Sequence, residues 1–277
     1  MKRKLHHQSL LVTLVTMLLL LAGSSASAQE DYNLSIAGVN VTSENCSDLT
    51  VIPGVNGKVS YNPATKTLYL EDATIDGGEN FGIKSTRDLR CVVKGDVSIT
   101  ALDYAAMVFS NKTTIKGDGR LTIKSSEVCA IILLDKSSLV IDGCTIDAEG
   151  YWGIGSGAGT TGVSLTIKNA SVTAKSTYGS ICNLASFTLE GCKITKPAGA
   201  VWNADKHAVC DAAGNIIIDE VVITPTGGTA IDFVTPEQLP AEGAIYDMNG
   251  VLRSESLEEL PTGVYIIGGQ KVMHVQR

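Results

Sequence analysis

Apolar and polar positions alternate in an eight-residue phrase that recurs along the chain. The copy at residues 68–75 is repeated from 139, 165, 187 and 216, and looser, lengthened copies begin at 91 and 113. A period of 22–29 residues indicates stacked repeats, and the alternation predicts strands with one buried face. The third position of every copy is aliphatic and is expected to point into a core. Its occupants are Leu70, Val93, Ile115, Ile141, Ile167, Leu189 and Ile218.

The fifth position of the phrase predicts a corner of the backbone. Gly and Asn dominate there, because they tolerate a positive φ at little steric cost. Each copy is therefore expected to form a strand, a tight corner and a second strand. Glu220, in the last copy, departs from this pattern, as terminal repeats often do. The fifth-position residues are Asp72, Gly95, Gly117, Gly143, Asn169, Gly191 and Glu220.

The fourth position carries charges that alternate between several successive copies. Stacked parallel strands lie about 4.8 Å apart, so such residues would face each other across the turns. We expect a solvated ladder that marks the outer face, in which each exposed pair contributes about 0–1 kcal/mol. The expected pairs are Glu71 with Lys94, Lys116 with Asp142, Asp142 with Lys168, and Lys168 with Glu190.

Three short strands per turn of this length predict an all-β protein, a right-handed single-stranded parallel β-helix with a small C-terminal antiparallel β module. Such turns bury their apolar sides only by stacking on their neighbours. The expected organisation is a signal peptide at 1–28, an N-terminal β cap at 29–67, the β-helix at 68–224, a linker at 225–230 and the C-terminal module at 231–277.

The N-terminus has the features of a secretory signal. Lys2-Arg3-Lys4 supplies the positive region, residues 10–21 are apolar, and Ala26-Ser27-Ala28 is an A-x-A cleavage site. Removing its three basic residues leaves 19 basic against 29 acidic ones, a net charge of −10. An acidic secreted chain is a poor candidate for nucleic-acid binding, and no other run is long and apolar enough to span a membrane. The sequence leaves the oligomeric state open.

All seven cysteines lie after the signal segment. Several occupy apolar positions of the phrase; Cys144 and Cys192 share a column with Ala73 and Ala170. We interpret them as core thiols that act as small apolar side chains, with disulfides as the alternative. A zinc site is not expected, because the chain has no C-x-x-C motif.

The last residues resemble the C-terminal sorting domain of the type IX secretion system of Bacteroidota. The matching stretches are Ile245-Tyr246-Asp247-Met248-Asn249-Gly250, Leu260-Pro261-Thr262-Gly263-Val264-Tyr265-Ile266-Ile267 and Gly269-Gln270-Lys271-Val272. That family's module is usually longer. The resemblance implies targeting to the envelope of a bacterium, with a chain that is secreted or held at the cell surface.

The body resembles the secreted carbohydrate-binding β-helix proteins that are related in fold to polysaccharide lyases. The phrases that carry this resemblance run from Tyr32 to Ser43 and from Val59 to Leu68. The resemblance spans about residues 31–224 and implies a polysaccharide or cell-surface glycan as partner. It transfers no catalytic residue.

Aromatic residues precede a small residue at similar places in several copies: Phe81, Tyr104, Trp152 and Tyr178. One interpretation is a strip that stacks against sugar rings; the other is an aromatic stack inside the core. A period of two places Trp152 on the side of Ile154, which favours the inside and would leave Tyr151 as the outward residue. The candidate ligand-binding residues are Trp152, Tyr151, Tyr178, Tyr104 and Trp202.

Carboxylates offer the other candidate chemistry. A β-helix lyase needs acids clustered around Ca²⁺ with a basic residue nearby, and a hydrolase needs two carboxyls about 5–9.5 Å apart. Asp76 and Asp147 fill the same column of the phrase, but three copies apart, about 14 Å at one strand spacing per copy. We therefore interpret the acids as a solvated face, with no catalytic residue and no cofactor, and keep Ca²⁺ as an alternative.

The function expected from the sequence is non-catalytic binding of a glycan, or adhesion, by a secreted or cell-surface protein of a bacterial envelope. A polysaccharide lyase or glycoside hydrolase that acts on an acidic polysaccharide is the first alternative. A structural surface protein is the second. An outward cluster of three or more acids beside an Arg or Lys would favour the enzyme, and an exposed line of Trp152, Tyr178 and Tyr104 would favour the binder.

Overall fold

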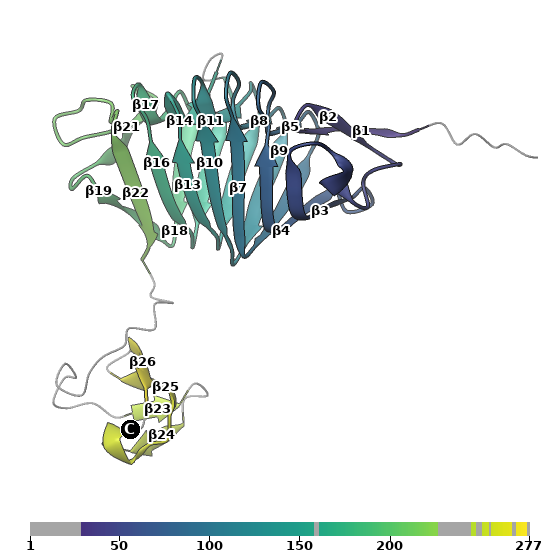
Figure 1. Cartoon of the computed structure of the whole chain (residues 1–277). Coiled ribbons are helices and arrows are strands. Elements are labelled where there is room, and N and C mark those ends of the chain that lie inside the picture. Colours follow the sequence, from purple (N-terminus) through teal and green to yellow (C-terminus); the bar gives the residue numbers. More distant parts are fainter. Residues whose placement is uncertain are drawn as a thin grey trace, which may run out of the picture.

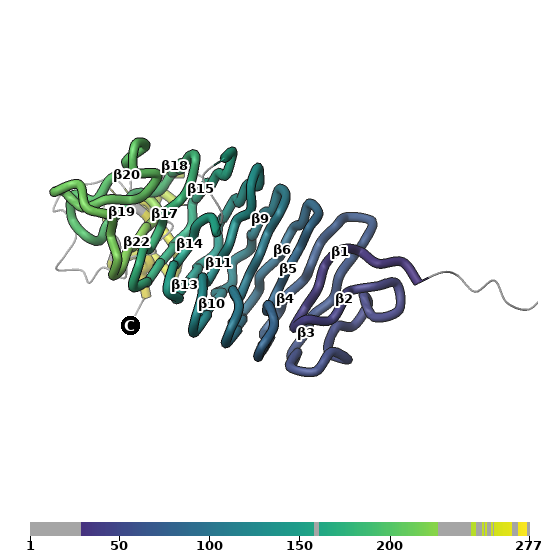
Figure 2. Tube along the Cα trace, turned by 90° about the horizontal axis from the view of Figure 1, so that it is seen from above, coloured from purple at the N-terminus to yellow at the C-terminus, as the bar shows by residue number. Residues whose placement is uncertain are grey.

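The computed structural model describes residues 29–157, 161–226, 245–247, 251–254, 256–267 and 270–275. The first two ranges wind into a parallel β-helix of about five turns, which Figures 1 and 2 show from two directions. The expected fold class is confirmed. No helix in the described part of the chain is long and apolar enough to cross a membrane. The expected signal peptide lies outside the described residues, as do residues 227–230 of the expected linker.

Each turn contributes three strands, and stacking of the turns produces three faces. Strand β4 (Thr67–Asp76) bends around the first corner and belongs to two faces. Face one continues through β6 (Leu89–Lys94), β9 (Lys112–Gly117), β12 (Ser138–Asp142), β15 (Ser164–Lys168) and β18 (Ser186–Glu190). Face two continues through β7 (Asp96–Ala101), β10 (Arg120–Ser125), β13 (Thr145–Glu149), β16 (Ser171–Lys175), β22 (Glu220–Pro225) and β19 (Cys192–Lys196).

Face three is a separate nine-stranded sheet. Its middle strands are parallel, and antiparallel strands border them at both ends. In spatial order the strands are β2 (Val39–Thr42), β1 (Asp31–Ile36), β5 (Ile83–Ser85), β8 (Met107–Phe109), β11 (Cys129–Leu133), β14 (Trp152–Ser156), β17 (Gly179–Cys182), β21 (Ala208–Cys210) and β20 (Val201–Asn203).

The N-terminal segment covers the first turn. The β1–β2 hairpin pairs with β5, while β3 (Val55–Asn62) pairs antiparallel with β4. The short 3₁₀ helix η1 (Leu49–Val51) lies between them in sequence, and Asp48 caps it by accepting a hydrogen bond from the backbone NH of Thr50. These elements satisfy the backbone groups that the first turn would otherwise expose as an edge.

The central core is built from the expected third positions of the phrase. Leu70, Val93, Ile115, Ile141 and Ile167 are all buried, with at most 1% of their surface exposed. Leu189 is half-buried, because it lies on the last turn. Ile218, in contrast, is 56% exposed, so the prediction that it points into the core is wrong.

The predicted corners are confirmed. Every fifth position of the phrase except the last has a positive φ, between 44° and 139°. The six residues are Asp72, Gly95, Gly117, Gly143, Asn169 and Gly191. Glu220, which interrupts the pattern, instead begins strand β22.

The charge ladder is only partly formed. Glu71 pairs with Lys94 at 3.7 Å, and Lys168 pairs with Glu190 at 3.8 Å. Asp142 lies in register with Lys116 and with Lys168, but neither lysine comes within ion-pair distance of it in the described structure. The half of the ladder centred on Asp142 is therefore not observed.

The seventh copy of the phrase does not form a turn. A hairpin links β20 to β21 and reverses the chain, so β22 runs antiparallel to its neighbours. It lies between β16 and β19, and thereby separates the fifth turn from the start of a sixth. The reversal explains why Ile218 is exposed, since a strand of opposite direction cannot continue the inward column of the phrase.

The cysteines behave as small core side chains. All seven lie in described segments and carry free thiols; Cys46 is partly exposed and the other six are buried. Burial raises the pKa of Cys91 and of Cys129 to about 12. Their thiols are therefore neutral at physiological pH.

The C-terminal residues form a small antiparallel sheet, as predicted. Its order is β24 (Leu252–Ser254), β23 (Ile245–Asp247), β25 (Gly263–Ile267) and β26 (Gln270–His274), with the 3₁₀ helix η3 (Leu257–Glu259) before β25. Ile245, Leu260, Tyr265, Ile267 and Val272 are its apolar core. Residues 231–244, 248–250, 255, 268–269 and 276–277 of the expected module lie outside the described residues.

Candidate functional site

Aromatic side chains gather at the corner between faces two and three. We call this set the aromatic strip; its members are Phe81, Tyr104, Tyr151, Trp152 and Tyr178. Backbone hydrogen bonds stack the corners directly, since Tyr178 NH donates to Tyr151 O at 3.0 Å and Tyr151 NH donates to Val128 O at 2.7 Å. A parallel β-helix therefore holds these residues on a rigid support whose spacing is set by the strands.

The rings of the strip touch one another in two groups. Trp152 and Tyr178 stack with centroids 5.2 Å apart and planes inclined by 29°, and Tyr151 lies 5.7 Å from Tyr178. Phe81 and Tyr104 form the other group, with centroids 4.8 Å apart. All three distances lie within the range that favours aromatic contact. The turn between the groups has smaller side chains, Val128 and Cys129.

The strip faces outward. Tyr178, Tyr104 and Tyr151 expose 60%, 45% and 38% of their surface. Trp152 is partly buried, and it packs against Cys129 and Cys182 in clusters that are distinct from the central core.

The expectation that Trp152 lies inside the helix core is therefore wrong. It begins strand β14, at the corner where the chain is still turning. Alternation from Ile154, which is in the central core, does not extend reliably to a residue at a corner.

Trp202 does not join the strip. It lies on the edge strand β20 and packs against Phe187, with ring centroids 5.7 Å apart. Both rings are partly buried against the end of the central core. Of the five candidates from the sequence, the structure brings Tyr151, Trp152 and Tyr178 into contact and places Tyr104 at the same corner two turns away.

Two charged groups act on the strip. The Glu127 carboxylate raises the pKa of Tyr151, through its negative charge and through a side-chain hydrogen bond. The ammonium of Lys84 lies 5.1 Å from the centre of the Phe81 ring, within cation–π distance. Neither Glu127 nor Lys84 was identified from the sequence. Glu127 belongs to the turn before that of Tyr151, and Lys84 lies only three residues after Phe81, where strand alternation would place the two side chains on opposite faces.

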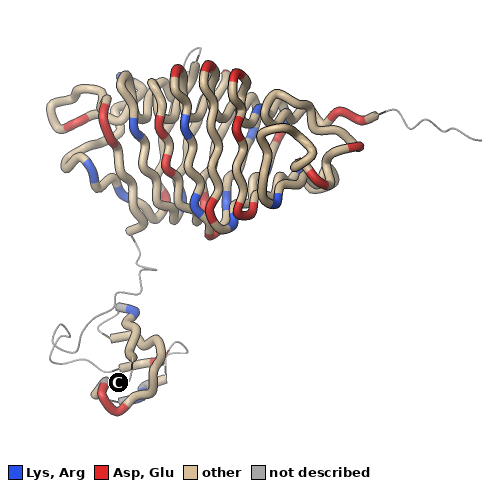
Figure 3. The backbone as a smooth tube through the Cα atoms, viewed as in Figure 1, with Lys and Arg blue, Asp and Glu red and all other residues tan. Residues whose placement is uncertain are grey.

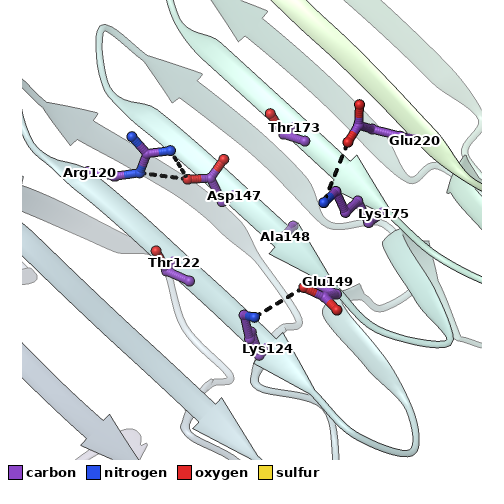
Figure 4. Close-up of a pocket in the computed structure, with 9 residues that line it drawn as sticks. All are labelled: Arg120, Thr122, Lys124, Asp147, Ala148, Glu149, Thr173, Lys175 and Glu220. Carbon is purple, nitrogen blue, oxygen red and sulfur yellow. Dashed lines mark hydrogen bonds and ion pairs between the residues drawn. The ribbon is translucent and has the colours of Figure 1, made fainter. Parts of the chain in front are cut away.

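A second surface is a shallow depression on face two, shown in Figure 4. Its volume is about 330 Å³. Three acids and three bases surround two threonines and Ala148 at its floor. The lining residues are Arg120, Thr122, Lys124, Asp147, Ala148, Glu149, Thr173, Lys175 and Glu220.

Each acid of the depression has a cationic partner. Arg120 donates to Asp147 from Nε and from Nη2, both at 2.7 Å, and Lys124 lies 3.2 Å from Glu149. Glu220 is flanked by two lysines, Lys175 at 3.5 Å and Lys196 at 2.7 Å. A hydrogen bond from Lys196, with the charges of both lysines, lowers the pKa of Glu220 despite partial desolvation.

This pairing limits the chemistry of the depression. A general acid needs a carboxyl whose pKa is raised, whereas the shift at Glu220 is downward. Among the described residues, no group of three or more His, Cys, Asp or Glu side chains has the spacing to hold a metal ion. The surface can instead offer matched donors and acceptors to a hydroxyl-rich ligand.

The expected column of Asp76 and Asp147 is not observed. Asp147 stands opposite Thr122, and Thr122 opposite Ser98, which pairs with Thr74. Asp147 therefore aligns with Thr74 instead of Asp76, because the strand pairing runs two residues out of step with the phrase between the second and third copies. The same shift places Ile115 opposite Cys91, not opposite Val93.

Comparison of the chain with protein-family models, with curated proteins and with solved structures finds no match.

Proposed function

We propose that this protein binds a glycan without catalysis, at the surface of a bacterial cell or after secretion. The observation that carries the proposal is the aromatic strip: three exposed tyrosines and one tryptophan held in line by stacked turns. Aromatic faces are large and apolar while the tyrosine hydroxyl is polar, a combination suited to the mixed faces of sugar rings. The signal-like N-terminus and the resemblance of the C-terminal module to a type IX sorting domain support an envelope location.

The β-helix beneath the aromatic strip favours binding of an extended polymer. The strip follows successive turns, so a chain of sugars can lie along it and contact several rings at once. Contiguous exposed apolar groups on a soluble protein usually mark an interaction site. The same surface would serve adhesion if the glycan belongs to another cell.

The experiment is binding of the chain 29–277 to an array of bacterial, plant and animal polysaccharides, with and without Ca²⁺. Retention is read from bound protein, and catalysis from released oligosaccharides. Tyr178→Ala is expected to weaken binding about fivefold to tenfold, since one aromatic contact contributes about 1 kcal/mol. Tyr69→Ala is the matched control, because Tyr69 is 43% exposed but lies on β4, away from the strip. Equal effects of the two substitutions would refute the strip as the binding surface.

A lyase or hydrolase of acidic polysaccharides is the second candidate. The depression favours it, because Asp147 and Glu149 lie there beside Arg120 and Lys124 on an adjacent strand. Released oligosaccharides that disappear in Asp147→Asn would support the enzyme. Retention of polysaccharide by wild type and by Asp147→Asn alike, with no release by either, would support binding alone. A lack of retention on every polysaccharide would favour a structural surface protein.

A further inference from the structure

A row of carboxylates accompanies the aromatic strip. Glu79, Asp103 and Glu127 lie in the corner loops of three successive turns, and all three are exposed. Backbone hydrogen bonds stack these loops: Leu102 NH donates to Gly78 O at 2.8 Å, and Ser126 NH donates to Ala101 O at 3.1 Å. Figure 3 shows acidic residues at the tips of successive turns along one edge of the β-helix. Neighbouring carboxylates of the row are therefore separated by about one strand spacing, roughly 4.8 Å.

Within the described part of the β-helix, this acidic row lacks the cationic partners that five acids on faces one and two have. On faces one and two, Glu71, Asp147, Glu149, Glu190 and Glu220 each have a lysine or arginine partner. None of the three carboxylates in the row has an ion pair among the residues that the structure describes. One of them, Glu127, reaches the strip directly and raises the pKa of Tyr151. The row therefore presents uncompensated negative charge beside exposed rings.

The strip itself already holds an ammonium group. The Lys84 Nζ atom lies 5.1 Å from the centre of the Phe81 ring, and the Tyr104 ring contacts the same phenylalanine. This contact is an internal example of what the strip accepts, a cation over an aromatic face. The stacked pair of Trp152 and Tyr178 and the adjacent Tyr151 offer comparable faces, with no lysine or arginine seated on them in the described structure.

We propose that the glycan bound by the strip carries free amino groups, as a polymer of de-N-acetylated hexosamines does. The inference rests on the proposed glycan-binding function. The apolar faces of the sugars lie on the rings of the strip, and protonated amines of the sugars nearest Phe81, Tyr104 and Tyr151 lie beside the carboxylates of the row. The net charge of −7 for the whole chain draws such a polycation toward the protein.

The test compares two hexasaccharides that differ only in acetylation: the hexamer of β-1,4-linked glucosamine and the corresponding hexamer of N-acetylglucosamine. Binding to the chain 29–277 is measured by titration calorimetry at pH 6 and low salt. The amino hexamer is expected to bind at least tenfold more tightly, a difference of about 1.4 kcal/mol. Its advantage should shrink as salt is raised, because exposed charges are screened.

The triple variant Glu79→Gln, Asp103→Asn, Glu127→Gln is expected to remove most of this advantage and to leave binding of the acetylated hexamer unchanged. The control variant Glu44→Gln, Asp96→Asn, Asp118→Asn removes the same charge from exposed acids away from the strip, and should retain the advantage. Both variants change only exposed side chains, so circular dichroism should show the same fold.

The outcomes separate this inference from the proposed function. Equal binding of the two hexamers, or equal effects of the two triple variants, would overturn the amino-sugar assignment while leaving glycan binding intact. No binding of any glycan, whether on the array or among the hexamers, would overturn both. Equal or tighter binding of hexalysine would show that charge alone is recognised, and would favour a basic peptide over a sugar.

Discussion

Gly117 is a corner where any side chain would collide with the backbone. Its φ is +139°, and a Cβ there would lie 1.9 Å from Val93 O, a backbone atom that cannot move aside cheaply. Gly143 has a φ of +78°, and the nearest atom to its virtual Cβ, Gly117 O, is 3.3 Å away. The two glycines therefore fulfil the same function in the repeat under different steric constraints.

Gly117→Ala is accordingly expected to destabilise the fold by about 3 kcal/mol or more, because strain and a backbone clash add. Gly143→Ala should cost only about 1–2 kcal/mol, the penalty of the left-handed conformation for a residue with a Cβ. Urea unfolding followed by circular dichroism measures both. Equal losses would show that φ alone, and not the contact with Val93, decides the requirement for glycine.

Burial of the Cys91 thiol is expected to lower the stability of the fold at alkaline pH. Burial, with a smaller contribution from Cys144, raises its pKa from 9.0 to about 12. The folded state therefore holds the thiol proton more tightly than the unfolded state, so the stabilisation is complete below pH 9 and is lost as pH rises toward 12.

The expected loss attributable to this thiol is about 2–3 kcal/mol between pH 9 and 11. It is measured as the difference between wild type and Cys91→Ala in urea unfolding at several pH values. Other groups titrate in both proteins and cancel. A pH dependence that is identical in the two proteins would contradict the assignment.

Strand β22 closes the C-terminal end of the β-helix by lying between β16 and β19. It pairs antiparallel with β16 on one side and with β19 on the other, and its inward residues Val221 and Ile223 are fully buried. Ile218 lies five residues before Ile223, outside the strand, and is mostly exposed. The end of the β-helix thus depends on a strand that the repeat pattern assigned to the wrong direction.

Ile223→Ala is expected to cost about 2–5 kcal/mol, as for other buried aliphatic truncations. Ile218→Ala, the matched control, should change stability by less than about 0.5 kcal/mol. Thermal or urea unfolding of the two variants measures the difference. Had β22 continued the parallel stack, Ile218 and Ile223 would both lie in core columns of the phrase, and the two costs would be similar.

The period and the corners could be predicted from the sequence because they depend on local chemistry. Leu70 and Ile141 occupy the inward positions of alternating strands and are buried. Gly95 forms a corner because glycine tolerates the positive φ that the corner requires. Register and strand direction depend on how many residues each corner contains. The two-residue offset that pairs Ile115 with Cys91, and the reversal before β22, are not encoded in the phrase itself.

The candidate site was predicted in its residues but not in its arrangement. The sequence singles out Tyr104 and Tyr178 because each precedes a small residue and a strand, and Tyr151 as the outward neighbour of Trp152. Whether Trp152 points inward depends on where β14 begins, a boundary that alternation does not define. Glu127 acts on a ring one turn away, and such contacts between copies become visible only when the turns are stacked.

The complete β-helix has two ends that must be closed, and the N-terminal end is closed by its own segment. Leu34 and Ile36 of β1 are buried where the strand pairs with β5, and β3 covers β4 along its length. Without them, β4 and β5 would present unpaired backbone groups beside an apolar interior. Such edges pair readily with other chains.

A chain that begins at Thr65 is therefore expected to form oligomers or precipitate, whereas the chain 29–226 should stay monodisperse with an unchanged unfolding midpoint of the β-helix. Size-exclusion chromatography with light scattering compares the two. Leu34→Asp in the full chain tests the same contact without deletion, because an unpaired buried carboxylate should detach β1 from β5. A monodisperse chain from Thr65 with wild-type stability would show that the stacked turns close their own edge, and that the N-terminal segment serves another purpose.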